Sequence, residues 1–276
     1  MKNLVVRTLS GIGFLAIMIG ALLWCRFSFA ALMLWITGMM MFEFFRMTMG
    51  SSYRFSQLLA ILAAVTLFVL TFLFKSYDIP GRMVIFSIIP IFIVMIDSLY
   101  VKDKTEFGKF ANLYTAILYI AVPMALTNFA VFDSRGNYDG MLLLCFFAII
   151  WGSDVGAYVF GCTLGQKYGK KLFPEISPKK SWIGFWGGFA VAILVAVGLH
   201  YAGLLGLSLV KSIAIGVVIN ISGVYGDLIE SQWKRHYSVK DSGSSIPGHG
   251  GYLDRFDSAL TALPMGIIFM EMTRLL

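Results

Sequence analysis

Charged side chains are scarce in this sequence of 276 residues: they make up 13% of it, whereas hydrophobic residues make up 58%. A soluble domain carries about 25% charged residues, because water has to solvate its surface. The shortage excludes a water-soluble globule, and the 24 Phe residues exclude an intrinsically disordered chain. Long apolar runs recur from one end to the other, which predicts a single integral membrane domain over residues 1–276.

Cysteine is also rare, with three residues at Cys25, Cys145 and Cys162. Their odd number and wide spacing argue against a disulfide framework and a cysteine metal site. The glycines at 161, 165 and 169 lack the spacing of a phosphate-binding P-loop, so a Walker-type ATPase is rejected. The sequence has no basic stretch interleaved with aromatic residues. Its net charge of +7 therefore indicates membrane topology and contact with anionic membrane lipids, and we expect no nucleic acid as a partner.

Nine apolar runs approach the roughly 20 residues that a helix needs to cross the hydrocarbon of a bilayer. We therefore predict an all-α, polytopic helical membrane protein with about nine transmembrane helices, since a β-barrel would show short alternating segments. We expect a division into N-terminal helices, at about residues 1–135, and a second half, at about 140–276, which carries the polar loops. The runs are Val5–Trp24, Phe27–Phe45, Phe55–Phe74, Val84–Tyr100, Phe110–Phe132, Met141–Phe160, Trp182–Leu205, Leu207–Ser231 and Phe256–Leu275.

The distribution of basic residues predicts the orientation. Nine crossings place every second loop on the side of the N-terminus, and most Lys and Arg residues fall on that side. The positive-inside rule then makes that side cytoplasmic, and we expect an integral protein of the bacterial inner membrane. The first run has bulky Leu23 and Trp24 where a signal cleavage site would need small residues, so we interpret it as an uncleaved helix.

Two long polar loops interrupt the apolar pattern, at Gly161–Ser181 and Gln232–Arg255, and both lie on the predicted cytoplasmic side. Asp154 precedes the first loop inside an apolar run, where an acid is costly unless it faces a polar cavity or a partner. For this first loop alone, packing of small residues and contact with anionic lipid explain the sequence as well as substrate binding does.

The second polar region carries a row of chemically different side chains. Asp227, Ser231 and Lys234 recur at i, i+4 and i+7, so a continuing helix aligns them on one face. A carboxylate, a hydroxyl and an ammonium in one row can hold a metal ion and a phosphate. The Gly-rich stretch before Asp254 permits a tight turn close to a ligand. For Asp257, simple capping of the last helix is the alternative role.

Polar residues, Gly and Pro recur in a fixed pattern through this second region. The pattern is Ser231-x-x-Lys234-Arg235, then Lys240-Asp241, then Pro247-x-His249-Gly250-Gly251-x-x-Asp254-Arg255-x-Asp257. It resembles the main signature of the phosphatidate cytidylyltransferase family, also called CDP-diacylglycerol synthases. The resemblance covers the second half of the chain in detail, which implies that about 140–276 is the catalytic half, and the first half in outline. A less specific second element corresponds to Asp154 and Ser177-Pro178-Lys179-Lys180-Ser181.

The resemblance implies a reaction of CTP with phosphatidic acid that gives CDP-diacylglycerol and pyrophosphate. It implies Mg²⁺ as cofactor, and it leaves a second cation such as K⁺ and a homodimer open. The phosphate nucleophile is already ionised, so the site needs charge neutralisation and alignment and no general base. The expected catalytic residues are Asp227, Asp254, Lys234, Arg235, Lys240, Asp241 and Arg255, with Asp227, Asp254 and Asp257 as metal ligands. The expected substrate-binding residues are Asp154, Ser177, Lys179, Lys180, Ser231, His249, Gly250 and Gly251.

Two other functions stay open at this point. A CTP-dependent polyprenol or phytol kinase would transfer a phosphoryl group to an alcohol and would need a general base. A secondary transporter could line an ion path with Asp154, Asp227 and Glu43, although the inverted repeats of such proteins are absent from the sequence. Otherwise Glu43 lies near a helix end, and we expect its carboxylate to reach the lipid headgroups.

Overall fold

The computed structural model describes residues 2–100 and 104–274, and most of them are helical. Within these residues, eight helical segments are long and apolar enough to cross a membrane. This confirms the prediction of a polytopic helical membrane protein. The eight segments are Val6–Trp24, Arg26–Thr48, Arg54–Tyr77, Gly81–Tyr100, Phe107–Val131, Met141–Tyr168, Trp182–Tyr201 and Leu209–His236.

The ninth predicted run, Phe256–Leu275, is built differently. Its first residue ends the short helix α11 (Leu253–Phe256), and α12 (Ala259–Arg274) follows with 16 residues, while Leu275 lies outside the described residues. At about 1.5 Å per residue, α12 covers about 24 Å, which is less than the hydrocarbon core of a typical bilayer. The predicted count of nine spans is therefore not confirmed.

The chain divides into two compact units. The N-terminal unit comprises the residues up to Gly140 together with Tyr237–Arg255, and the C-terminal unit comprises Met141–His236 together with Phe256–Leu276. The first boundary lies between Gly140 and Met141, and the polar segment Tyr237–Arg255 is grouped with the N-terminal helices. The predicted division into an N-terminal and a catalytic half stays a prediction.

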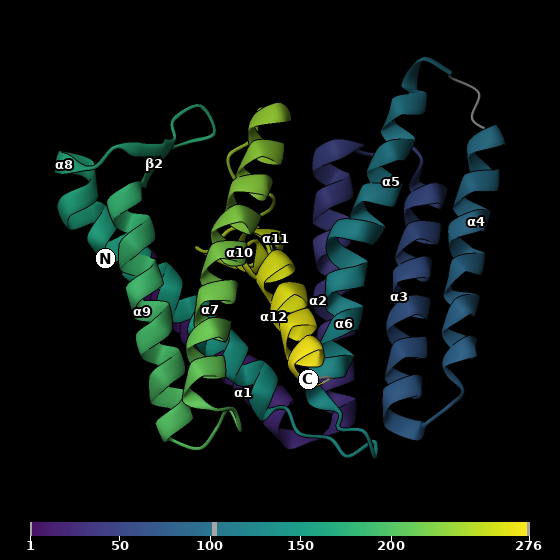
Figure 1. Cartoon of the computed structure of the whole chain (residues 1–276). Helices are drawn as coiled ribbons and strands as arrows, with labels where there is room; N and C mark the ends of the chain where they lie inside the picture. The colour runs from purple at the N-terminus through teal and green to yellow at the C-terminus, as the bar shows by residue number, and fades with distance from the viewer. Residues whose placement is uncertain (1, 101–103, 275–276) are drawn as a thin grey trace. The chain divides into compact units, whose positions relative to one another are not determined.

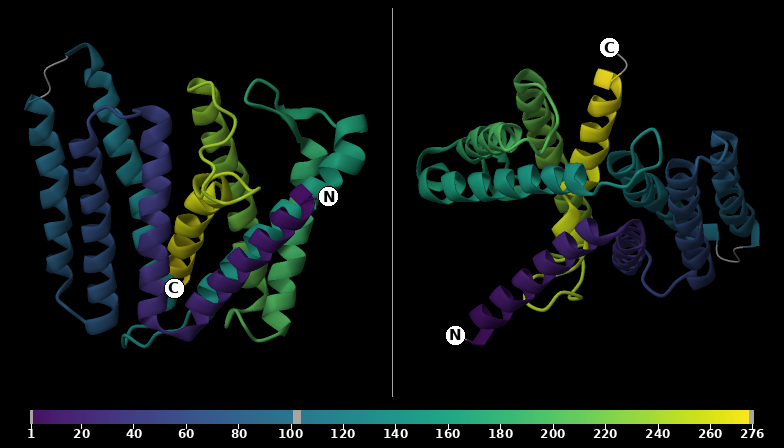
Figure 2. Two further views of the ribbon diagram at one scale, coloured as in Figure 1. Left: turned by 180° about the vertical axis from the view of Figure 1, so that it is seen from behind. Right: turned by 90° about the horizontal axis from the view of Figure 1, so that it is seen from below.

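The N-terminal unit is a set of apolar helices. The chain turns sharply between α1 and α2 at Cys25, whose backbone is extended, and α1 then runs obliquely to α2 (Figure 2). Helix α3 packs against α4 and α6, and Figure 1 shows α3 and α4 side by side. The helices are α1 (Lys2–Trp24), α2 (Arg26–Thr48), α3 (Arg54–Tyr77), α4 (Ile88–Asp97), α5 (Ala111–Ala116) and α6 (Val122–Val131).

The C-terminal unit is held together by closely packed helices. Its elements are α7 (Met141–Phe160), α9 (Trp182–Tyr201), α10 (Leu209–His236) and α12, and α10 packs against both α9 and α12 (Figure 1). Helices α7 and α9 approach each other through glycine. A Cβ atom on Gly156 would lie 2.7 Å from Val191 Cγ2 and 2.9 Å from the Gly187 carbonyl oxygen. Small residues thus allow this contact, as is typical of membrane helices.

The first polar loop contains strands that the all-α prediction missed. A π-helical turn (Gly161–Gly165) and α8 (Gln166–Tyr168) lead into an antiparallel hairpin of β1 (Lys171–Phe173) and β2 (Ser177–Ser181). Strands of three and five residues are too short to leave an alternating pattern in a sequence. The hydroxyl of Ser181 then accepts a hydrogen bond from the Gly184 amide, and this cap begins α9 directly at the end of the hairpin.

Candidate active site

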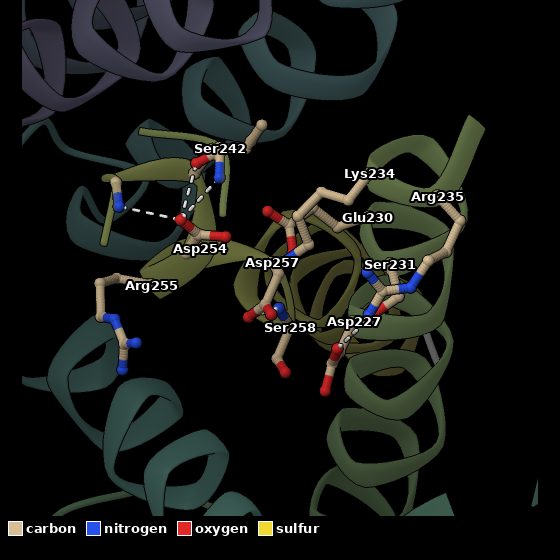
Figure 3. Close-up of polar contacts among 12 residues, drawn as sticks. Asp227, Glu230, Ser231, Lys234, Arg235, Ser242, Asp254, Arg255, Asp257 and Ser258 are labelled. Atoms are coloured by element: carbon tan, nitrogen blue, oxygen red, sulfur yellow. Dashed lines mark hydrogen bonds and ion pairs between the residues drawn. The ribbon is translucent and has the colours of Figure 1, made fainter. Parts of the chain in front are cut away.

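Helix α10 carries the predicted row of polar side chains. The helix continues past the predicted end at Ser231 as far as His236, so Asp227, Ser231 and Lys234 lie on one continuous helix. The Ser231 hydroxyl donates a hydrogen bond of 3.3 Å to Asp227 Oδ1 (Figure 3). The predicted alignment of these two side chains on one helix face is therefore confirmed.

An ion pair joins this helix to the hairpin of the first polar loop. Lys180 Nζ, on β2, lies 2.5 Å from Asp227 Oδ2, and the two side chains are 23% and 31% exposed. A side chain expected to bind phosphate thus lies against one expected to bind metal. The two motif regions that the sequence separates by about fifty residues meet at this pair.

Lys234 has a different partner. Its ammonium group lies 2.6 Å from Glu230 Oε2, one helical turn away, and the Glu230 side chain is only 1% exposed. A buried carboxylate is strongly disfavoured without a counter-charge. Lys234 therefore has a structural role as the counter-ion of Glu230, in addition to the phosphate contact that the sequence predicts for it.

The end of α10 also contacts the hairpin. Arg235 Nε donates a hydrogen bond of 3.3 Å to the Ile176 carbonyl oxygen, just before Ser177 at the start of β2. The backbone oxygen of Lys179 accepts a hydrogen bond of 2.6 Å from Gln166 Nε2, while the Lys179 side chain is exposed. The structure brings Arg235 and the hairpin together. Their contact with phosphate stays a prediction.

Asp257 lies beside α10, in the turn between α11 and α12 and outside the eight candidate spans. A Cβ atom on Gly226 would lie 2.5 Å from the Asp257 carbonyl oxygen, so glycine at position 226 permits this approach. Asp257 Oδ1 accepts a hydrogen bond of 2.7 Å from the Ser258 amide. This bond joins adjacent residues and does not reach the first turn of α12, so the alternative capping role stays a prediction.

Four carboxylates of the C-terminal unit lie near one another. Burial raises the pKa of the Asp257 carboxyl well above its usual range, and the negative charges of Asp227, Glu230 and Asp154 raise this pKa further. Asp154 is exposed, and its Oδ1 accepts a hydrogen bond of 3.4 Å from the Ser258 hydroxyl. Over the residues described, no three Asp, Glu, His or Cys side chains form a group that could hold a metal ion by themselves.

Asp254 organises the second polar loop, within the N-terminal unit. Its Oδ2 accepts three hydrogen bonds of 2.9 Å, from the Ser242 amide, the Ser242 hydroxyl and the Gly251 amide (Figure 3). Gly250 has a φ of +82°, which disfavours any side chain, and a Cβ atom there would lie 2.8 Å from Asp254 Oδ2. The two consecutive glycines thus let the backbone fold around this carboxylate.

Glu43 occupies a place that the sequence did not reveal. Its side chain does not reach the headgroups as expected, because the residue is only 2% exposed. Glu43 Oε1 accepts a hydrogen bond of 2.6 Å from the Ser245 hydroxyl, and Oε2 accepts one of 3.0 Å from the Leu253 amide. An acid inside an apolar run was a signal for a buried partner. The partner itself lies about 200 residues further along the chain.

The remaining predicted residues of this loop lie around its turn. His249 Nδ1 lies 2.9 Å from the hydroxyl of Ser10, on α1, and Arg255 Nε donates a hydrogen bond of 2.9 Å to the His249 carbonyl oxygen. Lys240 and Asp241 are exposed at the start of the loop. The proposed metal ligands Asp227 and Asp254 belong to different compact units, so their convergence on one ion stays a prediction.

The chain matches the family described as "Cytidylyltransferase family" over residues 5–273. It is 35% identical over 178 residues to a protein of Bacillus subtilis (strain 168) named phosphatidate cytidylyltransferase, an alignment that covers 64% of each chain. A Staphylococcus epidermidis protein of the same name is 36% identical over 182 residues, which is 66% of this chain and 67% of that protein. The alignments thus span about two thirds of the length of these curated relatives.

Proposed function

This chain belongs to the cytidylyltransferase family, and we propose that it is an integral membrane enzyme that makes CDP-diacylglycerol and pyrophosphate from CTP and phosphatidic acid. The relatives named above are phosphatidate cytidylyltransferases, which supports the proposal. The structural observation that supports it most directly is the Lys180–Asp227 pair. This pair links β2 of the first polar loop to α10, so charged side chains of both elements lie together within the C-terminal unit.

The chemistry fits the side chains that gather there. An ionised phosphate oxygen of phosphatidic acid attacks the α-phosphorus of CTP, the bond from that phosphorus to the bridging oxygen breaks, and pyrophosphate leaves. No proton has to be removed from the nucleophile, so a general base is unnecessary. Lys179, Lys180 and Arg235 would neutralise and align the phosphates, since several negative groups have to meet in line. The diacyl tails remain in the surrounding lipid during this transfer.

The donor set also fits Mg²⁺, which prefers carboxylate oxygen ligands. Asp227 and Asp254 would hold it, and Asp257 is the third candidate. Mg²⁺ usually takes one or two carboxylates and completes its coordination with substrate phosphates and water. The ion would supply charge stabilisation at the phosphates.

Product analysis of the purified protein tests the proposed function. The protein in mixed micelles is given phosphatidic acid, Mg²⁺ and each nucleoside triphosphate in turn, and mass spectrometry identifies the products. We expect CDP-diacylglycerol and free pyrophosphate with CTP. CDP as the by-product, formed with an alcohol such as a polyprenol, would instead identify a lipid kinase. Repeating the reaction with and without K⁺ tests the second cation.

The cytoplasmic orientation of the site is a separate proposal, supported by the excess of basic residues and by the cytosolic location of CTP. Ser177→Cys and Ser244→Cys variants are labelled with a membrane-impermeant thiol reagent. Exposed Cys162 is first replaced by Ser, and Cys25, on the opposite predicted side, serves as the control for outer labelling. We expect Cys25 to react in intact cells and the two introduced thiols to react only after the inner face is opened.

A further inference from the structure

The loop from Ser242 to Leu253 packs closely around the Glu43 carboxylate. A Cβ atom on Gly243 would lie 2.8 Å from Glu43 Oε1, and one on Gly251 would overlap Glu43 Oε2. Glycine at these two positions therefore lets the loop backbone close around the carboxylate. Gly251 was expected to bind substrate. Its contact with Glu43 gives another reason for glycine at this position, because a side chain there would overlap the carboxylate.

Ser242 connects this carboxylate to Asp254. Its hydroxyl lies 3.3 Å from Glu43 Oε2 and 2.9 Å from Asp254 Oδ2. A hydroxyl has one proton to donate, so Ser242 can donate to only one of the two carboxylates at a time. Leu253, which donates its amide to Glu43, directly precedes Asp254 in the chain. The position of Asp254 thus depends on Glu43 through Ser242 and through the adjacent backbone.

A buried carboxylate in an apolar helix has a high energetic cost, even when hydrogen bonds offset part of it. Glu43 is the single acidic residue of α2. We propose that Glu43 is a positioning residue, which holds the loop so that the Asp254 carboxylate is correctly oriented for its metal and nucleotide. This inference rests on the proposed function, since that function gives Asp254 its catalytic role.

The test compares Glu43→Gln with a control variant, Asp97→Asn. The control neutralises another acid of the N-terminal unit, and that acid accepts a hydrogen bond from Ser56 on α3. A positioning residue of a metal ligand typically affects metal affinity or activity by about 10- to 100-fold. We expect Glu43→Gln to lower kcat by about that factor and to raise the Mg²⁺ concentration for half-maximal activity. The KM for phosphatidic acid should stay within about twofold, and Asp97→Asn should change none of these quantities. Unchanged kcat and Mg²⁺ demand in Glu43→Gln would overturn the proposal.

A double-mutant cycle with Ser242→Ala tests the connection to Asp254. Coupled residues give non-additive effects, so we expect Ser242→Ala to cause little further loss in a Glu43→Gln protein. Multiplying losses would refute the coupling. If Glu43→Gln does not fold, Ser245→Ala removes a single donor to Glu43. The Ser245→Ala variant should then lower kcat by a few-fold, and an unchanged kcat counts against the proposal.

Hydrogen exchange separates this inference from the proposed function. Glu43→Gln should speed amide exchange in peptides covering residues 242–254, while Asp97→Asn should not, and this readout needs no substrate. Unchanged exchange would contradict the positioning role even if the enzyme is active. If the wild-type protein makes no CDP-diacylglycerol yet Glu43→Gln loosens the loop, the proposed function fails and the structural link from Glu43 to Asp254 stands.

Discussion

Removing the positive charge of Lys234 should destabilise the whole protein. The Lys234→Met variant leaves Glu230 with a buried carboxylate and without the ammonium group that lies 2.6 Å away. Breaking a buried ion pair by removing one partner costs about 3–5 kcal/mol, because the remaining charge has lost its compensation. At about 2–4 °C per kcal/mol, this predicts a fall in Tm of roughly 6–20 °C.

Replacing both partners should reverse most of this loss. The double variant with Glu230→Gln and Lys234→Met has no uncompensated charge, and neutral replacements of a buried pair are often close to wild-type stability. Thermal unfolding in detergent micelles, followed by intrinsic fluorescence, measures all three proteins. Exposed Lys167→Met is the matched control, for which we expect a change within about 0.5 kcal/mol.

A Tm of Lys234→Met equal to wild type would refute the ion-pair argument, as would a double variant no more stable than the single one. The double variant also separates the two roles of Lys234. If Lys234 contacts phosphate as predicted, the double variant is stable but has lost activity. If it keeps most of its turnover, Lys234 serves only as the counter-ion of Glu230.

Three further predictions concern the site. Asp227→Asn and Asp254→Asn should each lower turnover by about 100-fold or more while the protein stays folded. If a well-folded variant keeps its rate and its Mg²⁺ demand, the replaced carboxylate is not a metal ligand. Arg235→Lys should lower kcat/KM about tenfold, because an ammonium group cannot form the two parallel hydrogen bonds of a guanidinium group. Lys179→Ala should also lower kcat/KM. If kcat/KM is unchanged in both variants, these charges serve membrane topology alone. Gly250→Ala should cost about 1–3 kcal/mol in stability and loosen the loop around Asp254, measured by thermal unfolding and hydrogen exchange.

Continuous apolar runs predicted the helical membrane architecture, because an element that crosses lipid has to satisfy its backbone internally. The spacing of Asp227 and Ser231 predicted their contact, since residues four apart face each other on a helix. The hairpin of Lys171–Phe173 and Ser177–Ser181 could not be predicted in this way. Its strands are too short to show a period, and a Lys-rich segment at a membrane surface is equally typical of an irregular loop that contacts anionic lipid.

Glu43 shows the other limit of the sequence. An acid within an apolar run indicates a buried partner, but it does not identify that partner. One donor to Glu43 is the backbone amide of Leu253. Because nearly every residue has a backbone amide, the type of residue at position 253 does not reveal this role. Only the folded structure brings Glu43 next to a loop about 200 residues away. The family motif likewise marked Gly251 without indicating that a carboxylate fills the space beside it.

The two candidate metal ligands have different contacts in the structure. Asp227 lies 2.5 Å from the ammonium group of Lys180, so a cation that binds Asp227 has to compete with that lysine. Asp254 Oδ2 accepts hydrogen bonds from two amides and a hydroxyl, and these stabilise its negative charge. At Asp227, metal binding would release Lys180 for a phosphate, so the nucleotide and its ion would favour each other's binding at that pair.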